Sequence, residues 1–163
     1  MALLEKNPDI FLVASNIELW DEQKKTITEI KQQEPYIQIG DELLFNNQFT
    51  ISSVMCRNEN VKFDETLFFC EDYDLYLHLY TNGAKMVKMW DILCTYKIPN
   101  YSNEILEKHA LTRARILRKY NKRLIPYFEF HKYMVWYYLQ RKDYTSFIKQ
   151  CLKFGIGDFP TWK

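Results

Sequence analysis

Three carboxylate side chains fall within four residues at Glu71-Asp72-Tyr73-Asp74, directly after the apolar segment Leu67–Cys70. Carboxylates are among the groups that proteins position to accept protons from a reacting hydroxyl. The same residues also fit the first turn of a helix, because acids near the positive end of the helix dipole are stabilised by up to about 1 kcal/mol each. Helix capping alone explains the acids, so the flanking sequence has to decide between the two interpretations.

Other residue patterns that support catalysis are absent from the sequence. There is no glycine-rich phosphate loop and no G-x-S-x-G element, and the four glycines are scattered. The four cysteines are far apart without C-x-x-C spacing, which predicts reduced thiols of a cytosolic chain and no zinc site. The three histidines each lie in a helical pattern far from a clear partner, which favours a structural role. These residues are Cys56, Cys70, Cys94, Cys151, His78, His109 and His131.

The composition predicts a folded α/β chain. Its 163 residues are 47% hydrophobic, which excludes general disorder, and no apolar run approaches the length of a membrane span. No signal peptide is readable at the N-terminus. Strands are expected over 10–17 and 49–56, and as two short strands within 84–98 separated by a turn at Trp90-Asp91.

Helices are expected between and after these strands. Asp41, Ser102 or Asn103, and Asp143 are candidate N-caps, and Gly83 is expected to end one helix in the left-handed conformation. The expected helices span residues 2–7, 41–45, 71–80, 103–120, 126–139 and 144–153.

The charge is divided unevenly along the chain. Residues 1–103 carry 9 Lys and Arg against 16 Asp and Glu, net −7, whereas residues 104–163 carry 13 against 5, net +8. Two interpretations remain open. The halves attract each other within one fold, or the basic helical extension faces an anionic partner such as a phosphate-bearing ligand or a membrane surface.

Several short motifs follow one another within residues 1–102. They are Ile51–Met55 followed by Arg57, Phe63-Asp64-Glu65, Glu71-Asp72-Tyr73-Asp74-Leu75, Asn82-Gly83 and Tyr96-Lys97. In this order they resemble the acceptor half of family-2 inverting glycosyltransferases of the GT-A type: the strand before the acceptor site, the "G-F-D-E" turn, the "E-D-x-D-L" helix start, the helix end and the "Y-R" pair. Upstream, residues 7–16 look like the strand that follows the family's metal-binding D-x-D.

The resemblance implies a fold and a mechanism. The fold is an incomplete GT-A-like mixed sheet with flanking helices over residues 1–102, followed by a helical extension over 103–163. A complete member binds a sugar nucleotide in its N-terminal half, with Mg²⁺ or Mn²⁺ on the diphosphate. The Asp of the E-D motif is the general base toward the acceptor hydroxyl, and it corresponds to Asp72. Glu71 orients the loop or contacts the acceptor, and repulsion from Glu71 and Asp74 raises the pKa of Asp72.

Further site residues follow from this assignment. Ser52, Ser53 and Trp90 are expected to contact the acceptor, since hydroxyl and aromatic groups suit sugars. Lys97 and Arg57 are expected to face phosphate or another anion.

The chain departs from the family pattern in three places. The nucleotide-binding half with its D-x-D is missing, Lys62 replaces the Gly of "G-F-D-E", and Tyr96-Lys97-Ile98-Pro99 lacks the histidine of Y-R-x-H. We therefore expect a fragment, split product or degenerate descendant that is inactive alone and holds no metal itself.

The expected partners are a sugar nucleotide and a glycan or lipid-linked acceptor in the complete enzyme, but no nucleic acid. Exposed sheet surface favours self-association or pairing with the missing half. The expected location is cytoplasmic, either free in the cytoplasm or peripheral to the inner face of a membrane. The alternative is a non-catalytic binding or assembly module on a degenerate glycosyltransferase scaffold.

Overall fold

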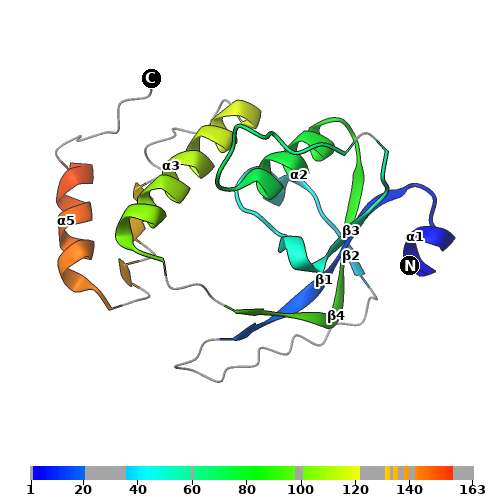
Figure 1. The fold of residues 1–163 in the computed structure, drawn as a ribbon, viewed down its shortest axis with the longest axis horizontal. Coiled ribbons are helices and arrows are strands. Elements are labelled where there is room, and N and C mark those ends of the chain that lie inside the picture. Colours follow the sequence, from blue (N-terminus) through cyan, green and yellow to red (C-terminus); the bar gives the residue numbers. More distant parts are fainter. Residues whose placement is uncertain are drawn as a thin grey trace. The chain divides into compact units, whose positions relative to one another are not determined.

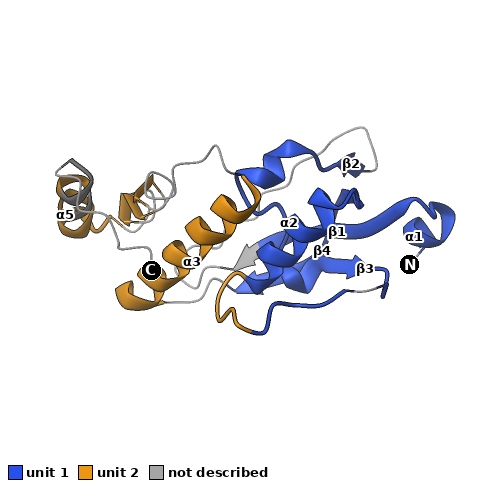
Figure 2. Ribbon diagram, turned by 90° about the horizontal axis from the view of Figure 1, so that it is seen from above, with its two compact units in different colours: residues 1–65, 71–100 blue, residues 66–70, 101–163 orange. Residues whose placement is uncertain are grey.

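The computed structural model describes residues 2–20, 36–59, 61–97, 101–121, 131, 132, 134, 135, 138, 139 and 142–155. The chain divides into two compact units (Figure 2). The first comprises Met1–Glu65 and Glu71–Asn100, and the second comprises Thr66–Cys70 and Tyr101–Lys163. The helix predicted over residues 126–139 falls largely outside the described residues, but those of its residues that are described are helical.

A mixed, open four-stranded sheet forms the centre of the first unit (Figure 1), so the predicted α/β class is confirmed. The strands are β1 (Ile10–Trp20), β2 (Tyr36–Gln38), β3 (Val54–Cys56) and β4 (Lys85–Lys97). They lie in the order β2-β4-β1-β3. The central strands β1 and β4 are parallel, and each edge strand is antiparallel to its neighbour.

The central strand β1 is buried on both faces at its N-terminal end. Ile10, Leu12 and Ala14 are fully buried, and Val13, which points to the other face from Leu12, is 7% exposed. A short, continuous apolar run is the pattern of a strand covered on both sides, which explains why this strand was predictable.

The prediction of two short strands in 84–98 is wrong, because β4 runs unbroken over thirteen residues. The register with β1 shifts where the turn was expected: Ala14 pairs with Lys88, but Asn16 pairs with Ile92. The Asn16 side chain donates to the Trp90 carbonyl over 3.1 Å at this irregularity. The extra residues at Trp90-Asp91 are therefore accommodated as a bulge, which kinks a strand without ending it.

The strand predicted over 49–56 is also mostly wrong. Only β3 pairs with β1, and the preceding η2 (Ile51–Ser53) is a 3-10 turn. The Ser53 backbone N–H and hydroxyl both donate to the Thr50 carbonyl, each over 2.8 Å. Ser and Thr side chains compete in this way with ladder hydrogen bonds, which explains the shorter strand.

The helical turn predicted over 41–45 is present as the 3-10 helix η1 (Asp41–Leu44), but Asp41 does not cap it. Gly40 is the N-cap residue, and its N–H donates to the Glu42 carboxylate over 2.9 Å. The Asp41 carboxylate instead accepts a hydrogen bond from the Tyr80 hydroxyl over 2.7 Å.

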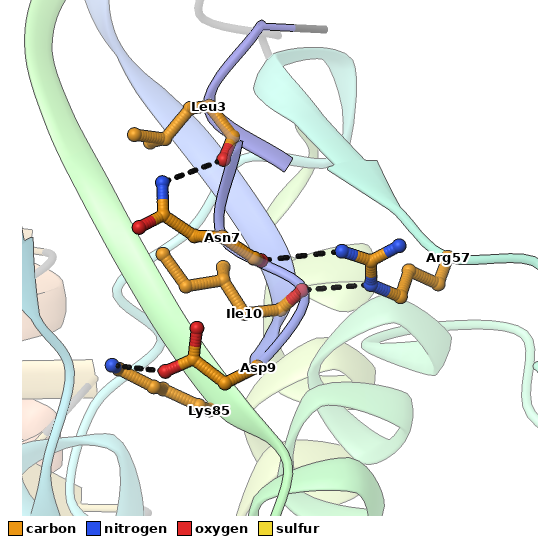
Figure 3. Close-up of polar contacts among 6 residues, drawn as sticks. All are labelled: Leu3, Asn7, Asp9, Ile10, Arg57 and Lys85. Atoms are coloured by element: carbon orange, nitrogen blue, oxygen red, sulfur yellow. Dashed lines mark hydrogen bonds and ion pairs between the residues drawn. The ribbon is translucent and has the colours of Figure 1, made fainter. Parts of the chain in front are cut away.

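The N-terminal helix α1 (Ala2–Lys6) is tied to β1 by Arg57 (Figure 3). The Arg57 guanidinium donates to the carbonyls of Ile10 over 2.9 Å and Asn7 over 3.2 Å. It also donates to the carbonyl of Leu4 over 2.7 Å. In the same turn, Lys85 donates to the Asp9 carboxylate over 2.7 Å. One side chain thus satisfies carbonyls left over where the helix ends and the strand begins.

Helix α2 (Glu71–Thr81) follows the acidic motif, as predicted. It buries one broad face, with Tyr73, Tyr76 and Leu77 each at most 1% exposed. It ends at Gly83, whose φ is 85°, and Ala84 N–H bonds the Leu79 carbonyl while Gly83 N–H bonds that of Tyr80. This pair of bonds is the Schellman motif, which confirms the predicted left-handed end.

The second unit contains α3 (Asn103–Tyr120) and α5 (Tyr144–Gly155). Its core joins Leu106, Ala110 and Ala114 of α3 to Met134 and Tyr138. Both predicted caps are confirmed: the Ser102 hydroxyl accepts from Ile105 N–H over 3.4 Å, and the Asp143 carboxylate accepts from Ser146 N–H over 3.1 Å. Within the described part of the chain, no helix combines the length and the apolar character needed to cross a bilayer.

Candidate functional site

Asp72 lies in the first turn of α2 with its side chain half-buried. One carboxylate oxygen accepts the N–H of Tyr73 over 2.7 Å, and the other accepts the side-chain amide of Asn47 over 3.5 Å. Asn47 also holds its own loop, because its side-chain oxygen accepts the N–H of Phe49 over 3.1 Å. The carboxylate is therefore held in place by the helix start and by a loop 25 residues earlier in the chain.

Burial raises the pKa of Asp72 above the usual range of an aspartic acid, and the charge of Glu71 adds to this rise. The hydrogen bonds from Tyr73 N–H and from Asn47 act in the opposite direction, because they favour the charged form. The pKa of Asp72 is thus raised, as predicted, but the largest cause is removal of the carboxylate from water, and repulsion by Glu71 contributes less. A carboxylate with a raised pKa is a stronger base than an exposed aspartate.

Tyr76 lies one helical turn after Asp72 and is 1% exposed. Its hydroxyl has no hydrogen-bond partner among the residues that the structure describes. The Phe49 ring packs edge-on against the Tyr76 ring, with centroids 5.1 Å apart. Burial raises the pKa of Tyr76 well above its usual value, and the nearby charge of Asp72 raises it further, so the phenol stays protonated as a donor. Sequence reasoning missed this residue, although its spacing of four from Asp72 on a helix was a usable signal.

The predicted acceptor residues Ser52 and Ser53 line a hollow of about 540 Å³ in the first unit. Its walls are mainly apolar and come from α1, β1, η2, β3 and β4, with Leu3, Val13 and Met89 among them. Asp72 and Trp90 do not line this hollow. The structure therefore brings the two serines together but does not place them in the same hollow as the predicted base.

The contacts of β4 explain this separation. Val13 faces the hollow, so its neighbour Ala14 and the paired Lys88 point to the other face of the sheet. The Lys88 ammonium donates to the carbonyl of Gln48 over 3.2 Å, and the adjacent Asn47 holds Asp72. The loop that positions Asp72 thus contacts the sheet face opposite to the hollow.

The remaining predicted residues lie in different surroundings. Glu71 begins α2 and is half-buried, and the half-buried Trp90 has an indole N–H without a partner among the described residues. Arg57 uses its guanidinium on the three carbonyls that join α1 to β1. Lys97 is exposed at the end of β4, paired in register with Trp20. The contacts of Arg57 are thus those of a structural residue, and its expected role in binding an anion stays a prediction.

The described residues hold no group of three or more His, Cys, Asp or Glu side chains placed to bind a metal ion. Comparison of the chain with protein-family models, with curated proteins and with solved structures finds no match.

Proposed function

We propose that this chain forms the acceptor side of an inverting glycosyltransferase, with Asp72 as the general base. In the complete enzyme, Asp72 removes the proton of an acceptor hydroxyl while that oxygen attacks the anomeric carbon of a nucleotide sugar. The nucleoside diphosphate leaves from the opposite face, and the sugar is transferred with inversion. The acceptor is a glycan or a lipid-linked sugar.

The state of the Asp72 carboxylate is the observation that carries this proposal. It is half-buried, held by Asn47 and Tyr73, and raised in pKa by its removal from water. A general base works best when its pKa approaches the operating pH, and this environment moves Asp72 in that direction. Exposed acidic side chains would stabilise the helix dipole equally well, so the dipole alone does not explain why Asp72 is half-buried.

The Tyr76 hydroxyl gives a second, independent support. A buried hydroxyl without a hydrogen bond costs about 1–3 kcal/mol, so such groups generally have a use. A hydroxyl group of the acceptor, or a water molecule, is a suitable partner beside Asp72. Tyr76 is then a positioning residue that helps to orient the oxygen from which Asp72 takes the proton.

A donor-binding half is required for turnover, with Mg²⁺ or Mn²⁺ held there to neutralise the leaving diphosphate. A reading frame upstream that encodes a D-x-D motif would support a complete or split enzyme. Its absence would support the alternative, a binding or assembly module. For the isolated chain we expect no heat when uridine- or guanosine-diphosphate sugars are titrated with Mn²⁺ in a calorimeter.

Replacement of the base tests the proposal in the enzyme reconstituted with its donor half. Asp72→Asn keeps the size of the side chain but cannot accept the proton, so transfer should fall by about 10²–10⁴-fold. Glu59→Gln is the matched control, because Glu59 is an exposed carboxylate outside the motifs that carry the resemblance. Circular dichroism verifies that both variants fold. Turnover that survives Asp72→Asn would remove Asp72 from the mechanism.

A further inference from the structure

Cys70 and His109 form a close pair in the second unit. The Cys70 sulfur lies 3.4 Å from Nε2 and 3.7 Å from Nδ1 of the His109 ring. The prediction that each histidine lies far from a partner is therefore wrong for His109. The two residues are 39 positions apart, and only the fold brings them together.

The surroundings hold both side chains in this arrangement. Cys70 is 8% exposed and adopts a φ of 58°, a left-handed conformation that is uncommon for residues other than glycine. The Phe69 ring packs against the His109 ring with centroids 6.0 Å apart. The His109 carbonyl lies 3.9 Å from the sulfur, farther than either ring nitrogen.

The charged groups around the pair are of both signs. Arg113 lies one turn after His109 on α3 and adds positive charge, whereas Glu71 follows Cys70 directly in the chain. Lys108 and Glu104 are exposed and paired with each other over 2.7 Å. The two ring nitrogens of His109 contact the sulfur more closely than the His109 carbonyl does, and a ring nitrogen, unlike a carbonyl oxygen, can take up the thiol proton near neutral pH.

We propose that Cys70 is a reactive thiol activated by His109 and is a modification site for small, soft electrophiles. The Cys70 proton moves to the His109 ring, and the resulting thiolate is stabilised by the imidazolium beside it. With an alkyl halide, the sulfur forms a bond to the carbon, the carbon–halogen bond breaks and the halide ion leaves. The proton remains on His109, so the step needs no oxidant or other reactant.

This site is separate from the proposed glycosyl transfer and does not depend on it. The other three cysteines provide internal references. Burial raises the pKa of the Cys56 thiol, which makes it less reactive, and Cys151 is exposed. Free thiols have a pKa of about 8.5, and a neighbouring protonated histidine lowers that value.

Alkylation of the full chain by iodoacetamide tests the proposal, with peptide mapping to give a rate for each cysteine. Between about pH 8.5 and pH 6.5 the thiol of a short unstructured peptide with a single cysteine, added as a reference, should lose about fiftyfold in rate, because its pKa is about 8.5 and the rate follows the thiolate fraction. Cys70 should lose less than about fivefold over the same range. A Cys70 profile parallel to that of the reference peptide, or no reaction of Cys70 in the folded chain, would overturn the proposal.

The role of His109 is tested by His109→Gln, which keeps a polar side chain but cannot hold the proton. In this variant the pH profile of Cys70 should become parallel to that of the reference peptide, whereas His78→Gln on the exposed face of α2 should leave the Cys70 profile unchanged. An unchanged profile in His109→Gln would overturn the assignment. If His109→Gln does not fold, the ultraviolet absorbance of thiolate is compared between the wild type and Cys70→Ser near neutral pH. A lower absorbance in Cys70→Ser supports the thiolate–imidazolium pair. Equal absorbance in the two proteins refutes it.

Discussion

Asn47 donates its side-chain amide to the carboxylate of Asp72 over 3.5 Å and so joins the loop before η2 to the first turn of α2. The bond acts on the charged form of the acid, because an amide donor stabilises a carboxylate more than a carboxylic acid. Burial has the opposite and larger effect on the same group. The pKa of Asp72 is therefore the result of two opposing contributions that can be separated by mutation.

Asn47→Ala should raise the pKa of Asp72 further. The variant removes a donor that lowers this pKa and leaves burial and Glu71 in place. Carbon-13 NMR of labelled aspartate carboxyls during a pH titration measures the shift, with Asp72→Asn to assign the signal. Gln48→Ala is the control, since that side chain donates to the Asn46 carbonyl. A pKa of Asp72 that is unchanged or lower in Asn47→Ala would contradict the geometry.

Asp72→Asn should gain stability relative to the wild type as the pH rises. The raised pKa means that the folded chain holds the Asp72 proton more tightly than the unfolded chain does. The stabilisation from this proton is present below the unfolded pKa and is lost as the pH rises through the folded pKa. Urea unfolding of both proteins from acid to neutral pH measures their free energies of unfolding. A wild type that becomes more stable relative to Asp72→Asn as the pH rises would refute this expectation.

Arg57→Ala should destabilise the first unit by about 2–3 kcal/mol. The change removes a charged donor from three carbonyls that join α1 to β1, and hydrogen bonds to charged groups are worth about 1.5–3 kcal/mol. Arg57→Lys should recover little of this loss, because a lysine cannot span several carbonyls as the planar guanidinium does. Urea unfolding gives the values, and the exposed Lys62→Ala should change the free energy of unfolding by less than about 0.5 kcal/mol.

Gly83→Ala should cost about 1 kcal/mol of stability. Space is available for a methyl group at this position, so the cost comes from the φ of 85°, which a side chain disfavours. Gly83→Asn should lose less, because asparagine tolerates the left-handed region better than alanine does. Thermal unfolding compares the three proteins, and equal stability of Gly83→Ala and the wild type would contradict this account.

Lys142→Gly should have the opposite effect and stabilise the second unit by roughly 0.5–1 kcal/mol. Lys142 has a φ of 56°, and the bonds from Lys142 N–H to Leu139 and from Asp143 N–H to Tyr138 repeat the motif found at Gly83. The exposed lysine occupies a position that favours glycine. Lys142→Ala keeps the backbone strain and should change little, and a loss of stability in Lys142→Gly would show that the side chain has a role of its own.

Elements with a strong local signal were predictable from the sequence. The apolar run of β1, the acidic start of α2 and its end at Gly83, and the Ser102 and Asp143 caps all depend on residues within one or two helical turns. The chemistry of each signal is local, so the long-range fold does not override it.

Features set by contacts between distant residues were not predictable. The bulge at Trp90 depends on pairing with β1, and the short length of β3 depends on where its own pairing with β1 begins, at Val54 opposite Ala14. At the candidate site, the motif alone led to the choice of Asp72, but Asn47 had no local signal that linked it to the acid. The Cys70–His109 contact was missed for the same reason, since 39 residues separate the partners.

The unequal lengths of the strands have a consequence for the stability of β4 along its own length. At Val87 and Lys88 this strand is paired on both sides, whereas from Ile92 to Lys97 its described pairing is with β1 alone. Opening the second stretch breaks hydrogen bonds to one neighbour only and exposes fewer buried side chains. Amide protons of a single strand should therefore exchange with deuterium in two classes, slow before the bulge and fast after it.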